Sequence, residues 1–235
     1  MRDRLERLFS IMLVISALII AASVAHREFA SPVQAAESPL DRPVFVPTWK
    51  EALSTGVEMG DTAAHVKIVE FADLECPFCR GFDRIARDAM RKHPTDVSIV
   101  FVHYPLESHR FAEQAARAAE CGANLGKFSE VVELVYTKQD SLGLKSWGSY
   151  AVDAGINDTL AFRRCALDTV SIKRIEAGKA LGAKLHVDAT PTVMVNGWKY
   201  GRRPPGAEEL EQLIQAIRQG KTPFDTAKGG KSGPS

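Results

Sequence analysis

The pair Cys76 and Cys79, separated by Pro77 and Phe78, constrains the fold of this chain more than any other sequence feature. The pair follows an apolar run, VKIVEFA at residues 66–72, after only three residues. Such a near-continuous run is typical of a central strand that is buried on both faces. Proline is favoured at the first position of a helix, where its missing N–H group is not needed. The pattern therefore predicts a strand followed by a helix, with the cysteines at the junction.

A second apolar run, VSIVFVH at residues 97–103, predicts another buried strand. Between the two runs, apolar residues recur at three- and four-residue spacing, which indicates a helix that ends near His93 and Pro94. These apolar residues are Phe82, Ile85, Ala86, Ala89 and Met90. A strand, a helix and a strand at this length predict a βαβ unit with parallel strands.

The rest of the domain is predicted to be mainly helical, which makes the expected fold class α/β. Residues 109–182 show helical periodicity without a convincing strand. Residues 192–200 contain two short apolar segments around Asn196-Gly197, a strong signal for a type I′ hairpin. Helical spacing over residues 210–217 then predicts a closing amphipathic helix.

The N-terminal part of the chain carries a membrane-targeting signal. Residues 9–25 form an uncharged apolar run of 17 residues that follows three arginines. This length is close to the lower limit for a transmembrane helix and longer than the usual apolar region of a signal peptide. We favour a transmembrane anchor, with a cleaved signal peptide as the alternative. In both cases we expect residues 1–8 to be cytoplasmic and the domain to lie on the periplasmic or extracytoplasmic side, tethered to the inner membrane if the anchor is retained.

The remaining segments follow from composition. The proline-rich residues 26–47 are expected to be a linker, residues 48–218 a folded domain and residues 219–235 a disordered tail. The chain is 45% hydrophobic and 25% charged, with a formal net charge of +1, as in an ordinary globular protein. We therefore expect no nucleic-acid partner. Because the linker is short, we also expect a monomer.

Three kinds of chemistry could use Cys76 and Cys79. A zinc site usually needs a second ligand pair, but Cys121 and Cys165 are single and 44 positions apart. A purely structural disulfide over so short a loop would add little stability. Redox exchange is favoured because the pair lies between a strand and a helix of a βαβ unit, in a compartment where disulfides persist. We expect no metal ion and no cofactor other than the redox-active cysteines themselves.

The predicted positions assign different roles to the two cysteines. Cys76 would lie at a helix N-terminus, where unpaired N–H groups stabilise a thiolate and lower the pKa of the thiol. Cys79 would lie one turn further into the helix and be shielded from solvent. In thiol–disulfide exchange Cys76 would form the mixed disulfide and Cys79 would resolve it.

Two further segments support a resemblance to a known family. Thr190-Pro191-Thr192 precedes the predicted hairpin, and HYPLESHRFAEQAARAAEC (residues 103–121) opens the helical region. With the cysteine pair, they make residues 49–219 resemble the DsbA-like thiol:disulfide oxidoreductases. The resemblance implies a thioredoxin fold with a helical insertion at about residues 106–184. It also implies a cis Pro191 facing the cysteines, and a Thr190 backbone that pairs with an extended substrate chain.

The family also carries a buried acid beneath the pair, and Glu70 matches its position. A buried Glu70 would have a raised pKa and could exchange a proton with Cys79, whereas the alternative is a solvated glutamate. Phe78 stands where strongly oxidising members carry His, and Thr190 where many carry Val. The direction of electron flow is therefore open, and we expect the pKa of Cys76 to lie between about 3.5 and 7.

Other candidate residues have more ordinary interpretations. Cys121 and Cys165 could be a second redox pair, but we favour a structural disulfide between two helices because neither has a strand-to-helix position. His103 and His109 could be catalytic or ligate a metal, but surface or capping histidines are favoured in the absence of visible partners. Aromatic residues that could line a groove are more often part of a core. They are Phe82, Trp147 and Trp198.

The resemblance implies an exported thiol:disulfide oxidoreductase. Its most direct form is a disulfide donor that oxidises cysteine-containing exported proteins and is recycled by a membrane thiol oxidase. The alternative within the same class is a reductase or isomerase that is kept reduced by a membrane electron donor. An alternative of another class is a non-catalytic thioredoxin-fold chaperone or metal carrier, because a fold alone does not determine function.

Overall fold

The computed structural model describes residues 12–21, 43–221 and 224. Residues 12–21 form a helix with exposed side chains. In these described ranges, no helix has both the length and the apolar character needed to cross a membrane. The other residues of the predicted anchor, residues 1–8 and most of the predicted linker lie outside the described residues.

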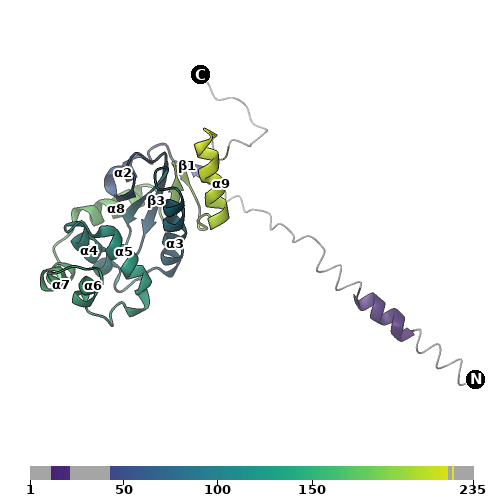
Figure 1. Ribbon diagram of the computed structural model, residues 1–235, viewed down its shortest axis with the longest axis horizontal. Coiled ribbons are helices and arrows are strands. Elements are labelled where there is room, and N and C mark those ends of the chain that lie inside the picture. Colours follow the sequence, from purple (N-terminus) through teal and green to yellow (C-terminus); the bar gives the residue numbers. More distant parts are fainter. Residues whose placement is uncertain (1–11, 22–42, 222–223, 225–235) are drawn as a thin grey trace, which may run out of the picture. The chain divides into compact units, whose positions relative to one another are not determined.

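A six-stranded mixed sheet forms the centre of the domain (Figure 1). Its strands occur in the order β1-β6-β5-β3-β4-β2. They are β1 (Val44–Phe45), β2 (Val57–Gly60), β3 (Val66–Ala72), β4 (Val97–His103), β5 (Thr192–Val195) and β6 (Trp198–Lys199). Strands β3 and β4 are parallel, and all other neighbouring pairs in this sheet are antiparallel. The predicted βαβ unit is confirmed, with α3 (Pro77–Lys92) as its crossover helix.

Helices cover both faces of the sheet and form a separate group at one end (Figure 1). Helices α3 and α9 pack on one face, and α2 and α8 on the other. Helices α4 to α7 pack against one another in the group between β4 and α8. Besides α3, the helices are α2 (Glu51–Thr55), α4 (Ala112–Ala123), α5 (Phe128–Thr137), α6 (Trp147–Asp153), α7 (Thr159–Leu167), α8 (Lys173–Lys184) and α9 (Ala207–Arg218). This is the predicted thioredoxin fold with inserted helices.

Strand β3 is buried on both faces because its side chains alternate between two apolar cores. Ile68 packs in the core beneath α3 and α9, whereas Val69 and Phe71 pack in the core beneath α2 and α8. Each of these three side chains is completely buried. The apolar run that predicted the strand therefore reflects two cores and not one.

The helical insertion ends earlier than the predicted residue 184. Helix α8 packs on the sheet and on α2 and does not belong to the inserted group. The backbones of α8 and β4 are close together, because a Cβ atom added at Gly178 would lie 2.3 Å from the carbonyl oxygen of His103 in β4. Its helical periodicity resembles that of α4 to α7, so the sequence pattern alone placed α8 among them.

The predicted hairpin is confirmed at β5 and β6. Asn196 and Gly197 both have positive φ angles, 46° and 89°, as a type I′ turn requires. Gly197 also lies against the Trp49 ring, where a Cβ atom would be 2.4 Å from Cδ1. The turn thus fixes the register of the β5–β6 hairpin and also holds the segment that precedes α2.

Both predicted boundaries of the domain differ from the structure. Strand β1 falls inside the predicted linker and pairs with β6, and the Phe45 ring lies 5.4 Å from the Trp198 ring. Near the other end, the Phe224 ring lies 5.0 Å from Trp198, although residues 219–235 were expected to bury little. A two-residue strand and a single aromatic residue have no periodicity, so neither could be predicted from the sequence pattern. Apart from 219–221 and Phe224, the predicted tail lies outside the described residues.

A disulfide joins the inserted helices. Cys121 of α4 and Cys165 of α7 are bonded, with their Cα atoms 6.1 Å apart and a separation of 44 positions in sequence. Cys121 is buried, and Cys165 packs against the same apolar core. The bond therefore links the first and last helices of the insertion.

We predict that the variant Cys121→Ala/Cys165→Ala is less stable but keeps its redox activity. Loss of a cross-link over this loop should cost about 3 to 4 kcal/mol, which corresponds to a decrease in melting temperature of roughly 6 to 16 °C. Thermal unfolding and peptide oxidation, both compared with the wild type, test this prediction. Loss of activity at an unchanged melting temperature would instead indicate a redox role for this bond.

Candidate active site

The cysteine pair lies where β3 leads into α3, as the sequence predicted. Cys76 is the N-cap residue of α3, with extended backbone angles, and Pro77 is the first helical residue. Cys79 is completely buried, whereas Cys76 is 3% exposed at the surface of a groove. Both cysteines are free thiols, and the backbone N–H of Asp73 donates to Cys79 Sγ at 3.5 Å.

A loop from the distant end of the chain completes the site. In its protonated form the Cys76 thiol donates a hydrogen bond to the carbonyl oxygen of Thr190, with a distance of 3.3 Å between sulfur and oxygen. The next peptide bond, Thr190-Pro191, is cis. Residues 114 positions apart in sequence are therefore in direct contact at the reactive sulfur.

The surroundings shift the pKa values of the two thiols in opposite directions. A hydrogen bond from the Cys79 thiol lowers the pKa of Cys76 from 9.0 to about 5, with further help from Thr190 and from the N–H groups of Cys79 and Phe78. Burial raises the pKa of Cys79 well above its ordinary value, and its hydrogen bond with Cys76 raises it further. At neutral pH Cys76 is therefore a thiolate and Cys79 a thiol.

Glu70 lies in β3, six residues before Cys76, and is completely buried. Neither carboxylate oxygen has a hydrogen-bond partner among the described residues. Burial raises the pKa of Glu70 well above its ordinary value, and the charge of Asp83 raises it further, against the opposing effect of Arg87. Asp83 and Arg87 form a buried ion pair in α3, with a distance of 2.8 Å. Glu70 therefore has the environment of a proton-carrying acid and not of a solvated glutamate.

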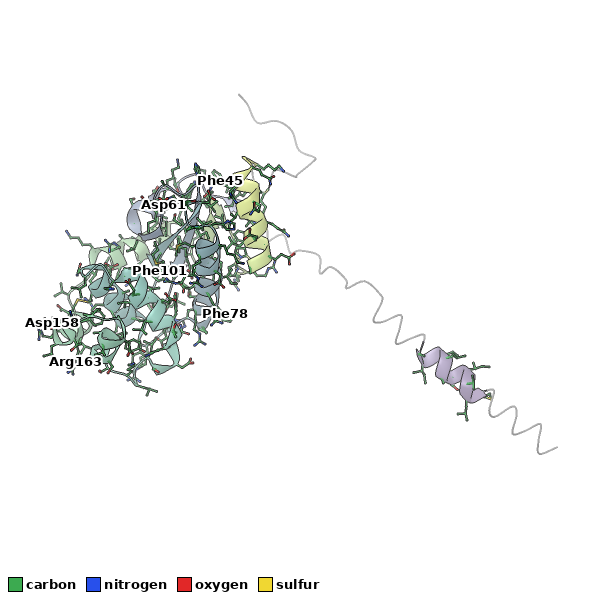
Figure 2. The ribbon with its side chains drawn as sticks, in the orientation of Figure 1. Phe45, Asp61, Phe78, Phe101, Asp158 and Arg163 are labelled. Carbon is green, nitrogen blue, oxygen red and sulfur yellow. A yellow bond between two sulfur atoms is a disulfide. The ribbon has the colours of Figure 1, made fainter. Side chains whose placement is uncertain are left out.

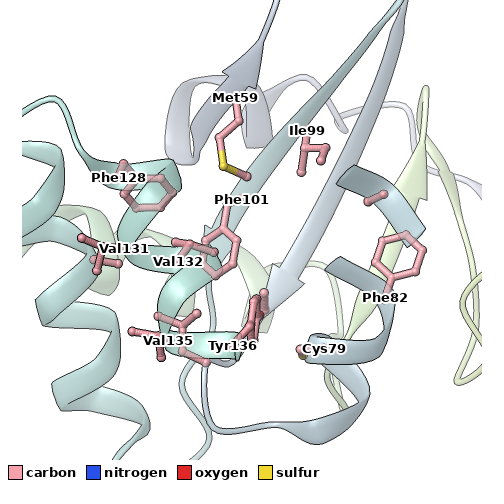
Figure 3. Packing of buried hydrophobic residues seen from close by; sticks show 14 of the residues in the cluster. Met59, Cys79, Phe82, Ile99, Phe101, Phe128, Val131, Val132, Val135 and Tyr136 are labelled. Carbon is pink, nitrogen blue, oxygen red and sulfur yellow. The ribbon is translucent and has the colours of Figure 1, made fainter. Parts of the chain in front are cut away.

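The inserted helices supply residues to the site that sequence reasoning missed. The Tyr136 ring from α5 lies beside Cys79 in the buried core (Figure 3), and its hydroxyl donates to the carbonyl oxygen of Asp73 at 3.5 Å. The Gln139 side chain donates to the carbonyl oxygens of Leu74 and Cys76, at 2.9 and 3.0 Å. Both residues lie within helical periodicity, where no local pattern separates them from packing residues.

A groove of about 850 Å³ runs past Cys76. Phe78, 75% exposed, forms part of its wall and lies at the outer surface near the N-terminus of α3 (Figure 2). Pro77 and Phe82 also line it, whereas Trp147 and Trp198 do not. The remaining wall comes mainly from two loops, one with Thr190 and Pro191 and one with residues 202–206. The lining of the groove is largely apolar.

Neither histidine considered in the sequence lacks a partner in the structure. His103 is buried, and its Nε2 lies 2.9 Å from Glu120 Oε1. His109 lines the groove, and its Nδ1 lies 2.8 Å from Asp73 Oδ2. Over the described parts of the chain, no three His, Cys, Asp or Glu side chains gather in a group that could hold a metal ion.

Comparison with known proteins identifies related sequences. A family model described as thioredoxin matches residues 52–216. A Na(+)/H(+) antiporter NhaA 1 from Mycolicibacterium gilvum is 34% identical over 170 residues, which are 69% of this chain and 26% of that protein. NhaA 3 from Salinispora tropica is also 34% identical, over 67% of this chain and 24% of its own length. This chain thus spans about a quarter of the length of these curated relatives.

Solved structures share the fold at low sequence identity. Oxidised BdbD from Bacillus subtilis is 21% identical, with a TM-score of 0.61 over 76% of this chain and 96% of that one. Alpha-DsbA1 from Wolbachia pipientis is 22% identical, with a TM-score of 0.58 over 69% and 90% of the two chains. A thioredoxin-like oxidoreductase from Silicibacter pomeroyi is 21% identical, with a TM-score of 0.57 over 70% of this chain and 93% of that one. The inserted helices are included in this similarity, since most of each chain is covered.

We predict that the reduced protein becomes more stable as the pH rises from about 5 to 9, relative to a Cys76→Ser variant. The pKa of Cys76 falls from 9.0 in the unfolded chain to about 5 in the folded protein, so its stabilising effect is complete above pH 9 and lost as the pH falls through 5. Within this window the difference in the free energy of unfolding should grow with pH, by at most about 1.4 kcal/mol per pH unit. Urea unfolding across the window measures it, and a constant difference would contradict the assignment of the thiolate.

Proposed function

Because the chain belongs to the thioredoxin family, we propose that it is an exported thiol:disulfide oxidoreductase whose Cys76–Cys79 pair exchanges electrons with cysteines of other proteins. The observation that carries this proposal is the position of Cys76 Sγ, which lies at a helix N-terminus, 3.3 Å from the carbonyl oxygen of Thr190, and lines an open groove. A thiolate in that position is accessible to a second sulfur, and Cys79 behind it is protected from other reactants.

The proposed reaction begins with the oxidised pair. A substrate thiolate attacks Cys76 Sγ, the bond between the two cysteines breaks, and Cys79 leaves as a thiolate. Glu70, held in its protonated form by burial, supplies the proton that neutralises Cys79. A second substrate thiolate then attacks the mixed disulfide and releases the Cys76 thiolate. Two electrons pass from the substrate to the pair, and the substrate leaves with a disulfide.

The low pKa of Cys76 favours the direction of disulfide donation. The pKa of Cys76, about 5, lies two units below pH 7. Ionisation of this thiol therefore stabilises the reduced form of the pair by about 2.7 kcal/mol at pH 7. For a two-electron couple this stabilisation raises the reduction potential by about 60 mV relative to a pair whose thiols stay neutral. The pair is thereby made more oxidising, although Phe78 contributes no side-chain hydrogen bond to the thiolate.

The groove supports the proposed recognition of an extended substrate chain. The Thr190 backbone would pair with the chain on the amino-terminal side of Pro191, in the manner of an added strand. The exposed Phe78 ring and the apolar wall would then contact substrate side chains without demanding a particular sequence. Such a surface suits an enzyme that acts on many partly folded proteins with exposed cysteines.

The location and the recycling partner follow from the same proposal. Export, with residues 9–25 as an anchor or signal peptide, would place the pair where disulfides persist. A disulfide donor needs an acceptor for its two electrons after each cycle, for which a membrane thiol oxidase is the expected class. A reductase or isomerase would instead need a membrane electron donor. The reduction potential distinguishes these alternatives.

We predict that the reduction potential of the Cys76–Cys79 couple lies at least about 50 mV above the −270 mV of thioredoxin, on the side of the −120 mV of DsbA. The reason is the thiolate of Cys76, which stabilises the reduced pair. Equilibration of the protein lacking residues 1–35 with glutathione buffers measures the potential. A value at or below that of thioredoxin would make the chain a reductant or isomerase.

We also predict that Glu70→Leu stabilises the protein and slows its turnover. The carboxyl group is buried without a hydrogen-bond partner among the described residues, a situation that costs about 1 to 3 kcal/mol, and leucine has a similar volume. Loss of the proton donor should slow the release of Cys79 by at least about tenfold. Urea unfolding and single-turnover peptide oxidation measure the two effects. Glu70→Gln serves as the polar control, and unchanged turnover in both variants would exclude the proton-transfer role.

A further inference from the structure

One pair of side chains at the active site has no part in the reaction described so far. Asp73 lies three residues before Cys76 and is 1% exposed. His109 lies in the turn that precedes α4 and lines the groove together with Cys76 and Pro191. The two residues are joined by a contact of 2.8 Å between Asp73 Oδ2 and His109 Nδ1. A buried acid thus holds a histidine in the wall of the groove that contains the reactive sulfur.

The hydrogen bonds of Asp73 determine which nitrogen of His109 carries the proton. Asp73 Oδ1 accepts from the backbone N–H of Glu75 at 2.7 Å, and Oδ2 accepts from the backbone N–H of Leu106 at 2.8 Å. Asp73 is therefore arranged as an acceptor, and the histidine donates its Nδ1–H group to Oδ2. In the neutral ring Nε2 then carries a lone pair, and no described residue forms a hydrogen bond with it.

The turn that carries His109 is fixed on both sides. On one side the backbone N–H of His109 donates to the carbonyl oxygen of Leu106 at 3.0 Å, and on the other the backbone N–H of Phe111 donates to the Glu75 carboxylate. Asp73 and Glu75 both belong to the loop that leads to Cys76. The same loop therefore positions the reactive sulfur and the imidazole ring.

We propose that His109 is the general base that removes the proton from an incoming substrate thiol, and that Asp73 is its positioning residue. This inference rests on the proposed exchange activity and adds a catalytic residue to it. Thiol–disulfide exchange requires the thiolate form of the attacking sulfur. Cys76 has its own stabilisation as a thiolate, but a substrate cysteine arrives as an ordinary thiol.

The step is balanced by a proton transfer at each sulfur. The substrate S–H bond breaks, its proton moves to His109 Nε2, and the substrate sulfur bonds to Cys76 Sγ. The Cys76–Cys79 bond breaks at the same time, and Cys79 takes its proton from Glu70. His109 then returns its proton to water when the oxidised substrate leaves. In the reverse direction, the imidazolium protonates the departing substrate thiolate.

The fraction of substrate thiol that is already ionised limits how much a general base can accelerate the attack. At pH 7 a thiol with a pKa of 8.5 is about 3% ionised, so complete deprotonation can accelerate attack by at most about thirtyfold. A substrate that is already ionised gains nothing from a base. This difference separates a catalytic role of His109 from a structural one, because a distorted groove would slow both kinds of substrate.

The test isolates the attack on Cys76. In a Cys79→Ser background, Cys76 is converted to its mixed disulfide with thionitrobenzoate, and the release of the coloured thiolate by a peptide is followed in stopped flow. Two peptides are compared, one with a single cysteine and one with selenocysteine in its place, because the selenol is already ionised at neutral pH. Each is tested with His109, His109→Gln and His109→Ala, and the last also with added imidazole.

The expected result is selective. His109→Gln and His109→Ala should slow the reaction of the cysteine peptide by about three- to thirtyfold and leave the rate of the selenocysteine peptide unchanged. Added imidazole should restore the rate of the cysteine peptide with the His109→Ala variant. His93→Gln is the matched control, because His93 also pairs with a carboxylate, Glu211 at 3.0 Å, but does not line the groove. Equal rates in all variants, or equal slowing of both peptides, would overturn the role of His109.

The outcome is separate from that of the proposed function. Oxidation of a two-cysteine peptide by the oxidised protein with both cysteines intact tests the exchange activity itself. If that oxidation fails, the proposed function fails. If it proceeds, and both peptides attack the His109 variants as fast as they attack the parent protein, only the inference about His109 fails.

Discussion

The burial of β3 on both faces is the constraint on which the rest of the site depends. The strand lies between β4 and β5 in the middle of the sheet, with an apolar core above and below it. Anything carried on its inner faces loses contact with water, including Glu70. The residues that follow the strand emerge at the edge of the sheet, where α3 begins. One strand therefore supplies a buried carboxyl group and also leads to Cys76 in the wall of the groove.

The asymmetry of the two cysteines follows from this placement. One turn of helix separates the sulfurs, yet the pKa of Cys76 is lowered to about 5 and that of Cys79 is raised. Hydrogen bonds stabilise negative charge on Cys76, whereas burial opposes it on Cys79. Identical side chains can thus take different roles in exchange without any group that ligates or modifies them. The protein controls which sulfur reacts through solvation and hydrogen bonds.

The sequence predicted the parts of the fold that have a repeating pattern or a strong local signal. The β3–α3–β4 unit, the hairpin at Asn196-Gly197 and the helical character of the insertion belong to this class. Strand β1 and the Phe224 contact do not, because each depends on Trp198 and lacks a pattern of its own. At the site, Cys76 and Cys79 were evident from spacing, and Glu70 and Pro191 through a family resemblance. Gln139 and Tyr136 were not, since their contacts with the active-site loop arise only in three dimensions.

Tyr136 and Gln139 show that the helical insertion contributes directly to the candidate site. The loop that leads to Cys76 packs against the insertion. In this structure Tyr136 and Gln139 cover it from the insertion, and the turn before α4 brings His109 to Asp73. The Cys121–Cys165 bond lies within the same group of helices and holds α4 against α7. The insertion therefore forms one wall of the candidate active site, and four loop residues, 73 to 76, take their positions partly from it.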